Sequence, residues 1–489
     1  MKYFSTRNEK VKYSAAQAMA MGLAPDGGLF VPEQIPAVSM DEIKALCAKD
    51  YRGRAVDIMQ RFLEEFSAEE LTYFVSHAYG ENYDDPAIAP LHFTDDRTAY
   101  LELWHGPTCA FKDMALQMLP YLLTASLKKT GEERQVCILV ATSGDTGKAA
   151  LEGFADVPGT KIFVFYPDGG VSKIQRLQMV TQSGANVGVC AVKGNFDDAQ
   201  TGVKKIFGDA AFAEELTKRG WFLSSANSIN WGRLLPQIVY YFSAYCDYVN
   251  SGKIAFRDKI NFCVPTGNFG NILAGWFAKQ MGLPVKRFLC ASNANNVLTD
   301  FFGTGVYDKN RPFHLTISPS MDILVSSNLE RLLYMLCGDE STADYMRRLS
   351  ETGNYAVSGE TLERIRNEFS AGFCDDPATC AKIASVWKEC SYLIDTHTGV
   401  AAAALDKYRA DTGDDTPAVI VSTASPFKFA ADVCGALGAE PGDDALAALS
   451  GFCGLPVPKP LNGLEDRTVR FDGVSEKCAM PDVVNSFIH

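Results

Sequence analysis

Residues 135–154, QVCILVATSGDTGKAALEGF, join a short apolar run to a Gly-rich turn and then to a stretch of helix-forming residues. The run at 135–141 is rich in Val, Ile and Leu, a pattern typical of a strand that is buried on both faces of a sheet. Gly and Asp in the turn favour a change of chain direction, and a helix is expected from Gly147. A strand, a turn and a helix in this order form the first half of a βαβ unit.

The same alternation recurs along the chain. Two more strand–helix pairs follow, and a long helix over about 230–249 leads into a second region with apolar runs of its own. This alternation predicts an α/β fold with two open, twisted, mostly parallel sheets. The expected strands are 135–141, 161–166, 186–192, 259–264, 286–291 and 418–422, and the expected helices include 172–182, 196–207, 328–337, 341–349 and 358–370.

Three domains are expected, because 489 residues are too many for one compact core. Residues 1–95 contain two capped helical patterns, at 39–48 and 67–79, and no visible chemistry, which indicates a small, mainly helical N-terminal domain. We assign the first set of strands to a smaller α/β domain over 96–235. The larger α/β domain is expected over 236–489, with its last fifty residues wrapping the surface.

Composition argues against several classes of function. Lys and Arg number 46 against 59 Asp and Glu, and this net charge of −13 disfavours sequence-independent binding to nucleic acid. The chain shows no apolar run of membrane-spanning length and no signal-peptide core. Its 14 cysteines contain no C-x-x-C pair and its six histidines are far apart, so we expect free thiols and no metal. These features predict a cytoplasmic protein that binds neither nucleic acid nor membrane.

Three of the expected strands end at polar or Gly-rich loops, at 142–147, 266–271 and 423–426. Open parallel sheets bind ligands beyond the carboxyl ends of their strands. We therefore expect one site between the two α/β domains, with these loops around it.

The loop Gly267-Asn268-Phe269-Gly270-Asn271 follows one expected strand and opens an apolar helix. Glycine lets the backbone turn sharply, and the helix N-terminus directs N–H donors and a partial positive charge at one point. These properties suit a phosphate group. A plain structural turn is the alternative, and the spacing differs from the dinucleotide fingerprint.

The loop at 142–147 has a different set of polar groups. It presents the hydroxyls of Thr142, Ser143 and Thr146 together with Asp145 at a helix start, where N–H donors suit a carboxylate or a phosphate. Simple N-capping by Asp145 or Thr146 is the alternative.

Lys112 lies between Phe111 and an apolar stretch. A buried lysine amine has a lowered pKa and is a competent nucleophile toward an aldehyde, although the adjacent Asp113 could instead neutralise it. Thr423, at a strand end, offers a hydroxyl. A reactive lysine, a phosphate-binding loop, a carboxylate-binding loop and a strand-end hydroxyl together indicate a site for pyridoxal 5'-phosphate.

Five segments together resemble the threonine synthase family, within the tryptophan-synthase-β-like enzymes of fold type II. The family's cofactor-lysine segment is similar to HGPTCAFKD at 105–113. The N-terminal signature of its long form, which has an added N-terminal domain, is similar to GLAPDGGLFVP at 22–32. Its internal motifs are similar to SGDTG at 143–147, NSINW at 227–231 and GNFGN at 267–271.

The resemblance implies roles for these residues. Lys112 would hold pyridoxal 5'-phosphate as a Schiff base and later move protons, residues 267–271 would bind the cofactor phosphate, and Thr423 would hydrogen-bond the pyridine nitrogen. The substrate's amino-acid end would meet Ser143, Thr146 and the residue at position 145. Many relatives carry Asn there, whereas the long form has Asp, as Asp145 does here.

The implied reaction converts O-phospho-L-homoserine and water to L-threonine and phosphate, the last step of threonine biosynthesis, so the implied enzyme is a carbon–oxygen lyase. Candidates for binding the substrate phosphate are Lys173, Arg176 and Arg233, near expected helix starts; charge on a helix surface is the alternative for each.

Two other functions stay open. A serine or threonine dehydratase or a β-replacement synthase of the same class would lack the segment at 22–32. A non-catalytic homologue that binds the cofactor or another ligand would not need Lys112 and all three loops intact. The sequence leaves open whether the protein is a monomer or a homodimer.

Overall fold

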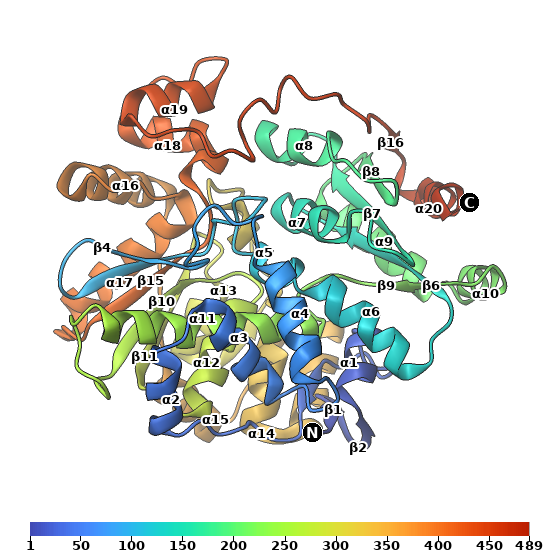
Figure 1. The fold of residues 1–489 in the computed structure, drawn as a ribbon, viewed down its shortest axis with the longest axis horizontal. Helices are drawn as coiled ribbons and strands as arrows, with labels where there is room; N and C mark the ends of the chain where they lie inside the picture. Colours follow the sequence, from blue (N-terminus) through green and yellow to red (C-terminus); the bar gives the residue numbers. More distant parts are fainter. Residues whose placement is uncertain (489) are drawn as a thin grey trace.

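The structure is a computed structural model that describes residues 1–488 (Figure 1). It contains two mainly parallel sheets and an N-terminal part with a small antiparallel sheet of its own. The predicted α/β class, with two open parallel sheets and an N-terminal domain rich in helix, is confirmed.

The smaller sheet has five parallel strands in the order β16-β8-β7-β6-β9. Its strands are β6 (Gln135–Ala141), β7 (Thr160–Pro167), β8 (Val187–Val192), β9 (Trp221–Ser224) and β16 (Val474–Ser475). The associated helices are α5 (Asp113–Leu116), α6 (Leu119–Thr130), α7 (Asp145–Phe154), α8 (Lys173–Val180), α9 (Phe196–Gly208), α10 (Ala210–Lys218) and α20 (Met480–Ile488). The three predicted strands of this region are confirmed to within one residue at each end, and β7 lies between β6 and β8.

The larger sheet has six strands in the order β14-β11-β10-β15-β5-β4, all parallel except β4. They are β4 (Leu91–Phe93), β5 (Thr98–Glu102), β10 (Ile260–Pro265), β11 (Val285–Ser292), β14 (Phe369–Phe373) and β15 (Ala418–Ser422). Its α-helices are α11 (Trp231–Asn250), α12 (Gly270–Met281), α13 (Val297–Thr304), α14 (Leu329–Glu351), α15 (Gly359–Glu368), α16 (Asp376–Cys390), α17 (Thr396–Thr412), α18 (Ala430–Leu437) and α19 (Ala445–Cys453). Short elements are the 3₁₀ turns η1 (Pro319–Met321), η2 (Pro426–Phe429) and η3 (Lys477–Ala479), and the antiparallel pair β12 (Val306–Asp308) and β13 (Asn354–Ala356).

The sheets do not divide at the boundaries expected from the sequence. β4 and β5 come early in the chain but pair within the larger sheet, β5 directly beside β15. β16 pairs with β8 of the smaller sheet, and α20 packs on α9. In Figure 1 the C-terminal segment runs from α19 across to β16 and α20. The boundary at 95/96 therefore separates β4 from β5, which pair in the larger sheet. The boundary at 235/236 separates β5 from β15 and β8 from β16, although each of these pairs belongs to one sheet.

The N-terminal part contains β1 (Tyr3–Ser5), β2 (Asn8–Tyr13), β3 (Phe30–Pro32), α1 (Ala15–Met21), α2 (Met40–Cys47), α3 (Tyr51–Gln60) and α4 (Ala68–Ala78). Capping boxes at Ser39 and Ser67 start α2 and α4, as the sequence predicts. α2 and α3 pack on α11 (Figure 1). The centroids of the Trp231 and Tyr3 rings lie 5.6 Å apart in an edge contact. This part shares one apolar core with the larger sheet.

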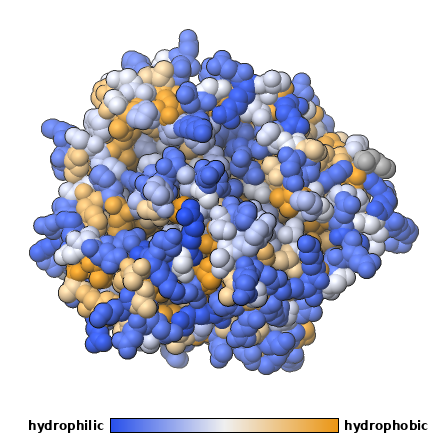
Figure 2. All heavy atoms as spheres, in the orientation of Figure 1, coloured by the Kyte–Doolittle hydropathy of each residue, from blue (hydrophilic) through white to orange (hydrophobic). Residues whose placement is uncertain are grey.

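Hydrophobic side chains on the face shown in Figure 2 are scattered in small groups among hydrophilic ones. Scattered apolar residues are normal on a protein surface and do not by themselves mark an interface. Among residues 1–488, no helix combines the length and the apolar character needed to cross a bilayer.

Candidate active site

The segment that carries Lys112 is tied to the end of β15. The backbone N–H of Phe111 donates to the carbonyl of Thr423 at 2.8 Å, and the N–H of Ser425 donates to the carbonyl of Cys109 at 3.0 Å. Lys112 and Thr423, which are 311 positions apart in the sequence, are therefore held side by side.

The amine of Lys112 is held in a mostly buried position, with 11% of the side chain exposed. Its Nζ donates to Ser320 Oγ at 3.2 Å and lies 3.6 Å from Asp145 Oδ2. Burial lowers the pKa of Lys112, an effect that Asp145 opposes and that the charges of Lys428 and Arg233 reinforce. A lowered pKa increases the fraction of free amine, which is the nucleophilic form.

The adjacent Asp113 does not neutralise Lys112. Its carboxylate accepts from the N–H of Thr108 at 2.8 Å and from the Thr108 hydroxyl at 2.7 Å. Burial raises the pKa of Asp113 to about 6, against the lowering effect of these two bonds. Asp113 thus shapes the turn before Lys112, and the carboxylate that faces the amine is Asp145.

The loop after β6 is held by Thr142, whose Oγ1 accepts from the N–H groups of Gly144 at 3.0 Å and Gly147 at 2.9 Å. Gly144 is the N-cap of α7, and its φ of +136° lies in a region that favours glycine. Neither Asp145 nor Thr146 caps the helix, so the capping alternative is wrong.

Asp145 is buried and has four polar neighbours. Its Oδ1 accepts from Gln175 Nε2 at 2.9 Å and pairs with Lys428 Nζ at 3.0 Å. Its Oδ2 faces Ser320 Oγ at 3.5 Å and the Lys112 amine. Burial raises the pKa of Asp145, but the two lysine charges outweigh it and hold that pKa well below the ordinary range.

Residues 267–271 form the turn that starts α12. The carbonyl of Gly267 accepts from Ser326 Oγ at 2.7 Å, and the carbonyl of Asn268 accepts from Asn328 Nδ2 at 3.0 Å. A Cβ on Gly267 would lie 2.5 Å from the carbonyl oxygen of Ser320, so a side chain does not fit there. Phe269 has a φ of +62°, a left-handed backbone conformation that is strained for a residue other than glycine. Such strained residues cluster at functional turns.

The amide of Asn271, the second residue of α12, has hydrogen-bond partners at its oxygen only. Its Oδ1 accepts from Tyr240 Oη at 2.6 Å and Tyr241 Oη at 2.7 Å, so the amide Nδ2 points the other way. That Nδ2 is buried and has no partner among the described residues. A buried, unpaired donor at a helix N-terminus is suited to an anion.

The three candidates for binding a second anion differ in burial. Arg233 is 3% exposed, its Nη1 donates to the carbonyl of Ala226 at 2.5 Å, and its Nε has no partner within the described residues. Burial lowers the pKa of Arg233 to about 10. Lys173 and Arg176 lie on the exposed side of α8, and Lys173 pairs with Glu465 at 2.6 Å. Burial favours Arg233 over the two exposed side chains, and all three remain predictions.

Sequence reasoning missed Ser320, which touches Lys112. Its N–H donates to His397 Nε2 at 3.1 Å, and His397 Nδ1 lies 2.8 Å from Asp395 Oδ2. Because Nε2 accepts, the imidazole proton lies on Nδ1 and donates to Asp395. His397 and Asp395 therefore hold the turn η1 that carries Ser320.

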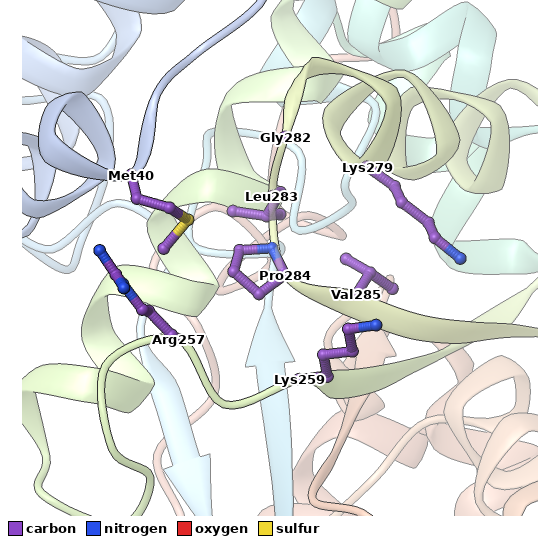
Figure 3. Close-up of a pocket in the computed structure, with 8 residues that line it drawn as sticks. All are labelled: Met40, Arg257, Lys259, Lys279, Gly282, Leu283, Pro284 and Val285. Carbon is purple, nitrogen blue, oxygen red and sulfur yellow. The ribbon is translucent and has the colours of Figure 1, made fainter.

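A cavity of about 520 Å³ lies elsewhere on the molecule (Figure 3). Arg257, Lys259 and Lys279 surround an apolar floor near the start of β10 and β11. These are the amino ends of parallel strands, whereas Lys112 and the three loops lie at the carboxyl ends. The cavity is separate from the candidate site.

Models of three protein families match the chain. The first, described as threonine synthase N terminus, matches residues 2–79. The second, pyridoxal-phosphate dependent enzyme, matches residues 99–424, and the third, threonine synthase C-terminal, matches residues 398–488. The second match spans the cofactor-lysine segment, the loops at 142–147 and 266–271, and Thr423.

Several similar proteins are known. Threonine synthase of Pseudomonas aeruginosa is 39% identical over 432 residues, which cover 88% of this chain and 89% of that protein. Human threonine synthase-like 1 is 41% identical, but the match covers 86% of this chain and only 58% of the longer human protein. The chain thus spans less than two thirds of the threonine synthase-like 1 proteins that it matches.

Solved structures agree in fold. Pyridoxal-phosphate-bound threonine synthase of Brucella melitensis is 37% identical with a TM-score of 0.89, over 100% of this chain and 99% of that one. The yeast threonine synthase structure is 32% identical with a TM-score of 0.90, over 100% and 98%. From these matches in sequence and fold, the chain belongs to the threonine synthase family of pyridoxal-phosphate-dependent enzymes.

Proposed function

We propose that the chain binds pyridoxal 5'-phosphate through a Schiff base on Lys112 and converts O-phospho-L-homoserine and water to L-threonine and phosphate. The observation that carries this proposal is the Lys112 amine. It is mostly buried, has a lowered pKa, and is held by Ser320 and Asp145 between the loops that follow β6, β10 and β15.

The residues present fit the cofactor. The turn at 267–271 has no room for a side chain at Gly267, and Asn271, at the start of α12, has a buried amide N–H without a partner among the described residues. Both features suit the cofactor phosphate. Thr423 is held beside Lys112 and would meet the pyridine nitrogen with a neutral hydroxyl. When bound, the cofactor supplies an electron sink for charge that develops at the substrate carbons.

Binding of the substrate follows from the remaining polar groups. Ser143, on the loop before α7, and Thr146, in the first turn of α7, are half-buried and would bind the substrate carboxylate. The hydroxyl of Thr142 instead holds that loop together, so its contribution to binding would be indirect. Arg233 has a buried guanidinium without a carboxylate partner among the described residues, which suits the substrate phosphate.

Lys112 would act as the base in the reaction. Its Nζ would take the proton from Cα and hold it for return to the carbon chain. Loss of a proton from Cβ would then allow the bond between Cγ and the phosphate oxygen to break. Water adds its oxygen at Cβ, and protons return to the carbon chain to complete L-threonine. Ser320 and Asp145 would hold the Lys112 amine in reach through these steps, and Arg233 would stabilise the departing phosphate.

Two alternatives remain as outcomes of a test. A dehydratase or β-replacement enzyme of the same class is disfavoured by the match of residues 2–79 to a threonine synthase N terminus. A non-catalytic homologue is disfavoured by the intact Lys112 and its partners. We further propose a cytoplasmic location, supported by 14 free cysteines, and an assembly no larger than a homodimer.

Turnover distinguishes these functions. The purified chain should release phosphate from O-phospho-L-homoserine, and Lys112→Ala should release none above background. Release of pyruvate from serine without phosphate from phosphohomoserine would assign a dehydratase. Equal phosphate release by wild type and Lys112→Ala would refute the proposal.

A further inference from the structure

Lys428 is a second lysine in the candidate site, and the proposed reaction gives it no step. It lies in η2, immediately after the loop that carries Thr423, and its side chain is fully buried. Its Nζ donates to the carbonyl of Thr108 at 2.7 Å and pairs with Asp145 Oδ1 at 3.0 Å. A buried ammonium needs a counter-ion, and Asp145 is its carboxylate partner.

The two oxygens of Asp145 have separate partners. Oδ1 is bound by Lys428 and Gln175, to which the proposed reaction gives no step. Oδ2 faces Lys112 and Ser320, which belong to the site. The Asp145 carboxylate is therefore held in place by the contacts of Oδ1, and Oδ2 faces the Lys112 amine.

The charge of Lys112 is not available throughout the proposed function, because a lysine amine attacks an aldehyde or takes a proton from carbon only in its neutral form. A buried carboxylate whose only cation disappeared would be strongly destabilised. The 3.0 Å pair with Lys428 provides a cation that takes no part in that chemistry.

We propose that Lys428 is a positioning residue, which fixes Asp145 through Oδ1 and keeps Oδ2 as an ionised hydrogen-bond acceptor facing Lys112. The inference rests on the proposed function for the role of Lys112. One consequence is chemical: any ligand group that meets Oδ2 has to bring a hydrogen, because an ionised carboxylate only accepts. Asp145 thus acts differently from an Asn at this position, which could donate.

The charges that face the Lys112 amine are Asp145, Lys428 and Arg233. Removing Lys428 removes a repulsion on the Lys112 ammonium and leaves Asp145 with Lys112 as its cation. Both changes favour protonated Lys112. Lys428→Met, which keeps the length and removes the charge, should therefore raise the pKa of Lys112.

The test measures that amine without turnover, so it can fail independently of the proposed function. The chain of residues 1–489, freed of cofactor, is acetylated with trace acetic anhydride between pH 6 and 11, and mass spectrometry of the Lys112 peptide follows the reaction. Lys428→Met should lower the free-amine fraction of Lys112 at pH 8 about tenfold, equivalent to a pKa higher by about one. The control Lys148→Met removes a mostly buried lysine that pairs with Glu152, and should leave Lys112 unchanged.

A double variant separates the two charges. In Asp145→Asn/Lys428→Met the amine loses its attraction to Asp145, the strongest of these charge effects, and its pKa should fall below that of wild type. The expected order is Lys428→Met, wild type, double variant, from highest pKa to lowest. Equal Lys112 pKa values in wild type and Lys428→Met would overturn the proposal.

If Lys428→Met does not fold, Asp145→Asn is compared with the double variant, which removes the ion pair as a unit. The Lys112 pKa must then be higher in the double variant, because Lys428 no longer repels the amine. Equal values in these two would also overturn the proposal.

Discussion

Arg233→Met tests whether the buried guanidinium binds the substrate phosphate. The Arg233 Nε is buried without a partner among the described residues, and the charge has no carboxylate beside it. Its pKa, lowered by burial to about 10, still leaves the group protonated at neutral pH. A phosphate that accepts from this Nε would gain one charge-assisted hydrogen bond, which contributes about 1.5–3 kcal/mol.

That free energy corresponds to a loss of about 10- to 150-fold in kcat/KM for O-phospho-L-homoserine. Stability should respond differently. Because Arg233 is a buried cation without a counter-ion and donates to one carbonyl, that of Ala226, its replacement by an apolar side chain of similar length should lower the free energy of unfolding less than Arg331→Met does. Steady-state phosphate release and chemical denaturation of the same preparation measure the two quantities.

Arg331→Met is the matched control. Arg331 is equally buried, but it donates to the carbonyls of Phe30 and Ile229 and to Asn328 Oδ1. Its removal leaves these acceptors unpaired and should cost about 2–4 kcal/mol of stability. The reasoning about Arg233 would be refuted if Arg233→Met kept kcat/KM within twofold of wild type.

Three further predictions concern residues around the site. The double variant Lys173→Ala/Arg176→Ala should keep KM within about twofold, because both side chains are on the exposed side of α8; a tenfold rise would return them to the site. Burial raises the pKa of Asp113 from 3.8 to about 6, so its contribution to stability, about 3 kcal/mol, is fully present below pH 3.8 and is lost as the pH rises through 6. Denaturation of Asp113→Asn should lack this loss, and an unchanged pH profile would contradict it. Tyr241→Phe removes one of two donors to Asn271 Oδ1 and should weaken cofactor binding about fivefold by titration, whereas unchanged affinity would show that Tyr240 suffices.

Most of the fold could be predicted because its buried strands are continuous apolar runs. β6, β10, β11 and β15 were predicted within one residue of their ends. The sheet partners of β5 and β16 could not be predicted, because both are short and join strands far away in the sequence. The two helices expected at 328–337 and 341–349 are confirmed as the two helical segments of α14, which are separated by the non-helical Gly338 with a φ of +79°.

Part of the site was equally accessible from the sequence. Lys112 and the turn at 267–271 stand out by composition, since a lysine among apolar residues and a Gly-Asn turn before an apolar helix are local signals. Ser320 carries no such signal, because its role depends on a contact 208 positions away. The sequence gives a similar local signal for Lys428 as a site residue. It lies between Phe427 and Phe429, just as Lys112 follows Phe111.

Reduction with borohydride tests the central claim most directly. The protein is incubated with pyridoxal 5'-phosphate, reduced and digested, and the peptide that carries the pyridoxyl group is identified by mass spectrometry. The account predicts one stoichiometric adduct, on Lys112, which is lost in Lys112→Ala even though Lys428 remains. An adduct on another lysine, or equal labelling of Lys112→Ala, would contradict it.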